Sequence, residues 1–208
     1  MIRGMVSVVL MISGSLQAAS ANRSALAVVG EQLQQLGDVV DIADEVGRIP
    51  AFNADDAETP STPVETLRRR LNRSDVVVIA TPEYAGSLPG ALKNALDWIV
   101  GSGELYSKPV VVISVGTTGG VHARRHLVQT LTWQGAHVIG ELGISAPRTK
   151  SNSAGTFVDQ PTIDELLRIA ALASAAAALP ADERLGLVRA LLIASQIDLG
   201  HIAPMPQE

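Results

Sequence analysis

The segment on either side of Pro82 constrains the fold more than any other part of the chain. Residues 75–80 are mostly β-branched and carry no polar side chain in the interior of the run, which is typical of a strand buried on both faces of a parallel sheet. Pro82 cannot donate a hydrogen bond to a neighbouring strand, so we expect the strand to end there. Residues 86–90 hold two glycines and a proline, and they favour a tight loop before a helix.

The helix expected after this loop has a single apolar face. Apolar residues recur at the helical spacing of i, i+3, i+4 and i+7: Leu92, Ala95, Leu96 and Ile99. Polar residues occupy the positions between them: Lys93, Asn94 and Asp97. A loop at the carboxyl end of a buried parallel strand is where open α/β sheets bind ligands. We therefore expect residues 81–90 to belong to a binding site.

The same succession of strand, loop and helix recurs along the chain. Further strands are expected at residues 6–12, 39–42, 109–115 and 137–142, and further helices at 22–36, 64–71, 121–133, 162–179 and 181–196. Residues 44–63 are polar and predict a long surface connection. The alternation predicts a flavodoxin-like α/β three-layer sandwich whose five-stranded parallel sheet has the order 2-1-3-4-5.

Length and composition favour one aliphatic domain. The chain has 208 residues, of which 47% are hydrophobic and only 3% aromatic, so one domain over residues 1–208 can bury an alanine-rich and aliphatic core. Residues 161–208 are expected to form a C-terminal helical extension. It would either extend an oligomer contact or cover the sheet edge, and we favour the second. The residues after His201 are expected to be loose.

Charge and cysteine content exclude several functions. The net charge of −5 argues against a nucleic-acid partner or an anionic membrane surface. The basic run at residues 68–70 is expected to be a solvated helix face rather than a partner contact. The chain has no cysteine, which excludes disulfides and thiol chemistry.

The N-terminus has two possible interpretations. Arg3, the apolar run at residues 6–12 and the small residues at 19–21 resemble a secretory signal with its cleavage site. A buried first strand has the same composition, and we favour it. No apolar run reaches the length of about 18 residues that a membrane-spanning helix needs. We therefore expect a cytoplasmic protein without a membrane partner.

The loop after the first strand is rich in small polar groups: Ser13, Ser15, Ser20 and Asn22. Any one of them could cap the helix that follows. Four in ten residues exceed what one cap uses, and Gly14 lies among them. Free N–H groups and the positive dipole end of a helix favour phosphate binding. Capping and phosphate binding remain alternatives at this point.

The predicted strand order brings two loops together. The order 2-1-3-4-5 has its switch point between the first and third strands, where the loops at residues 13–22 and 81–89 both emerge. One loop offers a phosphate cradle and the other offers free backbone groups. A ligand with a phosphate at one end and a flat, hydrogen-bonding ring at the other fits both loops. FMN has this shape.

Two motifs resemble the NADPH-dependent FMN reductase family. The first is Gly14-Ser15-Leu16-x-x-x-Ser20-x-Asn22, and the second runs through residues 82–98. The resemblance covers about residues 6–142. It implies a flavodoxin-like fold, bound FMN and reduction by NADPH or NADH. It also implies a dimer, with the helix after Pro82 at the interface beside the flavin; a homotetramer is the other assembly expected.

The resemblance also implies a set of cofactor-binding residues. The phosphate would contact Ser15, Ser20 and Asn22, with Gln17 where the family often has an arginine. One charge-assisted phosphate contact could thus be missing. The isoalloxazine ring would be lined by Pro82, Glu83, Tyr84 and Gly86 and flanked by Gly116 and Gly119. Glu83 is expected to act through its main chain only, and Tyr84 either at the ring or in a dimer contact. His122 is a second position where the family usually has an arginine.

The implied activity is that of an FMN-dependent NAD(P)H oxidoreductase. Hydride would pass to flavin N5, and two electrons would then reduce a quinone, an azo compound, an oxyanion or free flavin. Backbone N–H groups at residues 83–86 and 116–120 would stabilise the reduced ring, so no acid–base side chain is required. The alternative is a non-enzymatic electron carrier or redox-responsive binding protein, for which a charge of −5 is mild.

Other site chemistries lack their patterns. No G-x-G-x-x-G follows the first strand, which argues against a dinucleotide fingerprint. His122 and His126 lie four residues apart without a supporting carboxylate motif, so we expect no metal site. Neither Ser13 nor Ser15 lies in the G-x-S-x-G elbow of a nucleophilic serine.

Overall fold

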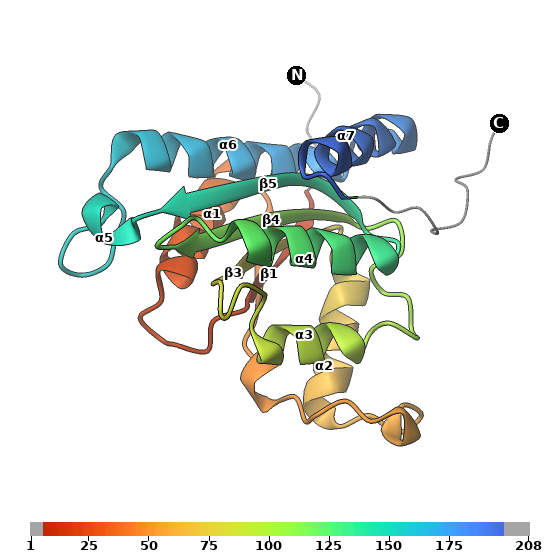
Figure 1. Cartoon of the computed structure of the whole chain (residues 1–208). Coiled ribbons are helices and arrows are strands. Elements are labelled where there is room, and N and C mark those ends of the chain that lie inside the picture. Colours follow the sequence, from red (N-terminus) through yellow and green to blue (C-terminus); the bar gives the residue numbers. More distant parts are fainter. Residues whose placement is uncertain (1–5, 198–208) are drawn as a thin grey trace.

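The computed structural model describes residues 6–197. Five strands form one parallel sheet in the order β2-β1-β3-β4-β5 (Figure 1). The strands are β1 (Val8–Ser13), β2 (Val39–Ala43), β3 (Val76–Thr81), β4 (Pro109–Gly116) and β5 (His137–Ser145). The predicted fold class and strand order are confirmed.

Helices cover both faces of the sheet (Figure 1). On one face lie α2 (Thr62–Arg73), α3 (Gly90–Asp97) and α4 (Val121–Trp133). On the other lie α1 (Ala21–Leu36) and α6 (Gln160–Ala176), and α7 (Ala181–Ala194) packs against the edge strand β5. Three short helices complete the fold: η1 (Val46–Arg48), η2 (Ala54–Asp56) and α5 (Pro147–Lys150). No helix within residues 6–197 is long and apolar enough to cross a bilayer.

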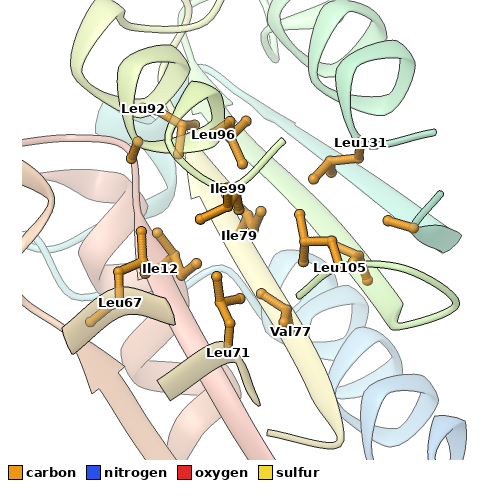
Figure 2. Packing of buried hydrophobic residues seen from close by; sticks show 14 of the residues in the cluster. Ile12, Leu67, Leu71, Val77, Ile79, Leu92, Leu96, Ile99, Leu105 and Leu131 are labelled. Carbon is orange, nitrogen blue, oxygen red and sulfur yellow. The ribbon is translucent and has the colours of Figure 1, made fainter. Parts of the chain in front are cut away.

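The side chains of β3 alternate between two hydrophobic cores. Val77 and Ile79 face the core formed with α2, α3 and α4, where Figure 2 shows them beside Leu71 and Ile99. The residues on either side of them face α1 and α6. Every residue of β3 is buried, as the run of β-branched residues predicts for a central parallel strand. The predicted apolar face of α3 also lies in the first core.

Most element boundaries agree with the sequence to within a few residues, and the differences have local causes. The apolar run at residues 6–12 supplies β1, the strand between β2 and β3, as favoured above. Helix α6 begins at Gln160, two residues before the predicted start, because Asp159 caps it and accepts a hydrogen bond from the Thr162 N–H at 3.1 Å. Helix α5 and the two 3₁₀ helices were not predicted from the sequence. The residues after His201 lie outside the described part of the chain.

The basic run on α2 is not simply solvated. Arg68 forms an ion pair with Glu104 at 2.7 Å. Arg70 lies 3.2 Å from Asp41 and 3.8 Å from the buried Glu45. The expectation of a solvated helix face was therefore wrong for two of the three arginines. The carboxylate partners of both arginines are distant in sequence. These ion pairs hold α2 to neighbouring parts of the chain.

One buried amide joins α1 to β4. The Nδ2 group of Asn22 donates to the Val115 carbonyl at 3.0 Å, and its Oδ1 accepts from the Val115 N–H at 2.9 Å. Asn22 is 3% exposed, so water cannot replace these bonds without a local opening. Because Val115 is the penultimate residue of β4, this pair fixes the start of α1 beneath the end of that strand.

We expect Asn22→Ala to lower the free energy of unfolding by about 2–4 kcal/mol, because two buried main-chain groups lose their partners. Urea unfolding measures the change. Ser24→Ala is the control, since the Ser24 hydroxyl makes only one long bond, to the Ser20 carbonyl at 3.4 Å. Equal midpoints for the two variants would show that the Asn22 pair does not stabilise the fold.

Candidate functional site

Two loops meet at the carboxyl edge of the sheet. We call residues 14–20 the first loop and residues 82–89 the second loop. The Gly14 N–H donates to the Ala80 carbonyl at 2.8 Å. A Cβ atom on Gly14 would lie 2.9 Å from both the Thr81 hydroxyl and a Leu92 methyl group. Because real Cβ atoms essentially never approach so closely, glycine at this position allows the first loop to pack against the end of β3 and the start of α3, which flank the second loop.

A third loop lies at the same edge. Residues 117–120, which we call the third loop, connect β4 to α4. Ser13 pairs with Ala80 in the β1–β3 register, and Thr81 pairs with Ser114 in the β3–β4 register. The three strands therefore end at nearly the same level, and the loops that follow them converge. This is the arrangement that the predicted strand order requires.

The hydroxyl groups of the first loop shape its backbone. Ser20 is the N-cap of α1, and its Oγ accepts from the Asn22 N–H at 3.2 Å. Ser13 Oγ accepts from the Ser15 N–H at 3.3 Å, and Ser15 Oγ accepts from the Gln17 N–H at 3.4 Å. Ser13, Ser15 and Ser20 are all buried, whereas Gln17 is exposed. Capping is thus established for Ser20, and the other two serines fold the turn.

The start of α1 can still receive an anion. The first N–H groups of a helix have no intrahelical acceptor, and the first turn of α1 contains no acidic side chain to neutralise the helix dipole. Ser15 is 2% exposed, and its hydroxyl is placed inside the loop. Backbone N–H groups and a hydroxyl beside a positive helix end are the donors that a phosphate group needs.

The side chain of Asn22, which was expected at the phosphate, is bonded to β4. Both polar ends of its side chain are bonded to Val115, and its own N–H donates to Ser20. Its amide group is thus directed at the main chain of β4. We therefore assign Asn22 to holding α1 against β4. A short polar residue in this motif is compatible with either role, and the sequence contains no sign of the bond to a strand 93 residues away.

The second loop contains a tight hairpin. Tyr84 and Ser87 exchange two main-chain hydrogen bonds of 2.9 and 3.0 Å. Ala85 and Gly86 between them have φ values of 51° and 71°, which is the type I′ arrangement with both central residues in the left-handed region. Alanine is strained there by about 1–2 kcal/mol. The hairpin holds Tyr84 at the edge of the sheet with 55% of its surface exposed.

Glu83 joins the second loop to α4. Its Oε2 atom accepts from the N–H groups of His122 at 2.8 Å and Ala123 at 3.1 Å. The N-cap of α4 is Gly120, which has no side chain to cap the helix, so Glu83 supplies that cap from another loop. A second tie is the 3.0 Å contact between Ser87 Oγ and His126 Nδ1.

The expectation that Glu83 acts only through its main chain was therefore wrong. The sequence shows only that a cap is missing, because α4 follows two glycines and has no capping residue of its own. The carboxylate that fills this need lies 39 residues earlier in the chain, and sequence spacing alone does not identify it. The His122 N–H bonds to Glu83, and the His126 ring contacts Ser87, so both histidines lie where the second loop packs on α4.

Glycines keep the third loop narrow and open. Gly119 and Gly120 have φ values of 77° and 64°, in the left-handed region that favours glycine. A Cβ atom on Gly120 would overlap the Ser114 hydroxyl. A Cβ atom on Gly116, by contrast, would meet nothing within 4 Å. On the Cβ side of Gly116, the last residue of β4, there is thus space for a flat ligand to approach the backbone.

The three loops bring together nearly all the predicted cofactor-binding residues. The first loop contributes Ser15, Gln17 and Ser20; the second contributes Pro82, Glu83, Tyr84 and Gly86; the end of β4 and the third loop contribute Gly116 and Gly119. Residues 6–197 contain no cluster of three or more side chains able to hold a metal ion. The cradle at α1 and the uncovered backbone at β3 and β4 suit a molecule with a phosphate and a planar ring.

We expect Glu83→Ala to lower the free energy of unfolding by about 1 kcal/mol, as loss of a helix cap does. The N–H groups of His122 and Ala123 should exchange with deuterium faster, which hydrogen-exchange mass spectrometry measures. Glu58→Ala removes an exposed carboxylate from the loop before α2 and should change neither quantity. If both variants protect the start of α4 equally, Glu83 is not its cap.

Comparison with known proteins agrees with this geometry. Residues 8–150 match the model of the NADPH-dependent FMN reductase family. An NAD(P)H-dependent FMN reductase of Pseudomonas aeruginosa is 36% identical over 159 residues, covering 73% of this chain and 84% of that protein. A quinone reductase of Escherichia coli K12 is 35% identical over 130 residues, covering 58% of this chain and 69% of that protein.

Solved structures support the fold. The flavoenzyme NAD(P)H:(acceptor) oxidoreductase of Paracoccus denitrificans superposes with a TM-score of 0.65 at 24% identity, over 89% of this chain and 98% of that one. The matched family segment includes β1 to β5 and all three loops described above. This chain therefore belongs to the NADPH-dependent FMN reductase family and is an oxidoreductase that uses FMN as cofactor and NAD(P)H as reductant.

Proposed function

We propose that FMN binds across the three loops and serves reduction of a quinone or a similar flat two-electron acceptor. The observation that carries this proposal is the close packing of Gly14 in the first loop against the end of β3, from which the second loop leaves. It places the first loop, which leads into α1, beside the point where the second loop begins. A single molecule with a phosphate and a ring can therefore contact both.

The first loop is proposed to hold the phosphate. The donors would be Ser15 Oγ, the Gln17 side chain and the free N–H groups at the start of α1, which Ser20 caps. Asn22 would act indirectly by keeping α1 against β4. Because Ser13, Ser15 and Ser20 bond the backbone of the loop and of the helix start, this backbone needs little ordering when the anion arrives.

The second and third loops are proposed to hold the ring. Pro82, the main chain of Glu83 and Gly86, and the ring of Tyr84 would contact one side, with Gly116 and Gly119 beside it. When bound, FMN takes a hydride from NAD(P)H and passes two electrons to the acceptor. The protein orients the ring and directs main-chain N–H groups toward it. It needs no nucleophile for this task.

The acceptor is proposed from the shape of the site and from relatives. Tyr84 is 55% exposed at the edge of the site, so a flat aromatic molecule can stack near the ring from solvent. The relative from Escherichia coli is named a quinone reductase. A quinone is therefore the first acceptor class to test, followed by azo compounds, oxyanions and free flavin.

We also propose a homodimer or homotetramer in the cytoplasm, where NAD(P)H is available. The exposed Val100 and Trp133 line one shallow cavity between α3 and α4, and paired subunits would cover this apolar surface. Sedimentation equilibrium tests the assembly, and a monomer at micromolar concentration would overturn it. Fractionation of cells tests the location, with recovery outside the cytoplasmic fraction as the contrary result.

The function is tested by the visible absorption of the purified protein with FMN. Adding NADPH should bleach the flavin band, and adding a quinone without oxygen should restore it. NADPH consumption should then continue in proportion to the quinone supplied. A band that NADPH leaves unchanged would contradict the reductase function. Bleaching that oxygen restores but quinones, azo dyes, oxyanions and free FMN do not would contradict the proposed acceptors.

A further inference from the structure

A cavity of about 460 Å³ opens beside the first turn of α1. On one side it is lined by Gln17 of the first loop and Ser24 of α1. On the other side it is lined by Arg148 of α5 and Asn152 of the segment that follows. Figure 1 shows α5 at the same end of the sheet as the start of α1. The cavity thus joins the first loop to a part of the chain that the three loops do not include.

The segment that carries Arg148 is folded against the site. The Ala146 N–H donates to the Thr117 carbonyl at 3.3 Å, which ties the start of α5 to the third loop. The Val158 N–H donates to the Lys150 carbonyl at 2.9 Å and closes the segment after α5. Phe157 is 4% exposed and lies in the core with α1 and α6. Arg148 is therefore presented by an anchored structure.

The first loop lacks a positively charged side chain to pair with a phosphate group, and Arg148 can supply one. Residues 13–22 contain no charged side chain, whereas a phosphate monoester carries a charge of about −1.5 to −2 at neutral pH. Ser15 is 2% exposed, and its Oγ accepts from the Gln17 N–H. Arg148 is exposed and pairs with no carboxylate in residues 6–197. Arg148 is the one charged residue among those that line the cavity.

We propose that Arg148 binds the phosphate of FMN across this cavity, together with the side chain of Gln17. The planar guanidinium can donate two parallel hydrogen bonds to phosphate oxygens. The segment after β5 then becomes a fourth part of the cofactor site, and Arg148 determines the preference for FMN over riboflavin. This inference rests on the proposed placement of FMN across the three loops.

The test compares Arg148→Met with Arg23→Met. Arg23 is an exposed arginine in the first turn of α1 that does not line the cavity, so it controls for charge near the same helix. Dissociation constants of the apoprotein for FMN and for riboflavin are measured by quenching of flavin fluorescence. Arg148→Met should weaken FMN binding about tenfold and leave riboflavin binding unchanged. Arg23→Met should change neither by more than about twofold.

Arg148→Lys should recover part of the lost FMN affinity, since the point charge returns without the planar fork. Circular dichroism and thermal unfolding check that each variant folds as the wild type does. The wild-type protein should also prefer FMN to riboflavin less strongly as the salt concentration rises, because salt screens the charge pair.

Three results would overturn the inference. Arg148→Met could bind FMN as the wild type does, it could lose affinity for FMN and riboflavin equally, or Arg23→Met could lose as much as Arg148→Met. In a fourth contrary result, Arg148→Met raises the KM for NADPH but leaves the KM for NADH and the affinity for FMN unchanged. This result would assign the cavity to the 2′-phosphate of NADPH. If the wild-type apoprotein binds neither flavin, the proposed placement of FMN fails as well.

Discussion

The site depends on the missing side chain of Gly14. A Cβ atom there would lie 2.9 Å from Thr81 and Leu92, and the Gly14 N–H donates to the Ala80 carbonyl of β3. The parallel register brings β1, β3 and β4 to a common edge, and this contact packs the first loop against the end of β3, where the second loop begins. A strand order can be shared by proteins with many functions. Here the first and second loops leave neighbouring strands at the same edge of the sheet, where one extended ligand can contact both.

Hydrogen bonds between distant segments hold this arrangement before any ligand binds. Asn22 fixes α1 to β4, and Glu83 fixes the second loop to α4. Each of these two side chains bonds two main-chain groups. Groups held in this way lose little further freedom on binding, which favours affinity and a defined ring position. Ala85, in the hairpin of the second loop, has a left-handed backbone conformation that is strained, and such strain is common at functional sites.

The sequence predicted the elements well where the signal is local. The β-branched run of β3 and the full range of α4 were predicted closely because burial on both faces and helical periodicity leave direct patterns. The capping of α4 by Glu83, the use of Asn22 and the seating of Arg148 depend on contacts between segments far apart in the chain. Residue type and spacing carry no such information. Residue patterns and the strand order therefore located the loops, whereas the hydrogen bonds made by individual side chains became visible only in the structure.

A crystal structure of the protein with FMN tests the central claim most directly. The account predicts the phosphate at the start of α1 beside Ser15 and the ring between Tyr84 and Gly116, with the Glu83 carboxylate still bonded to α4. FMN bound at another edge of the sheet would contradict the account. So would a ring that reaches its place only after the first loop separates from the end of β3 at Gly14.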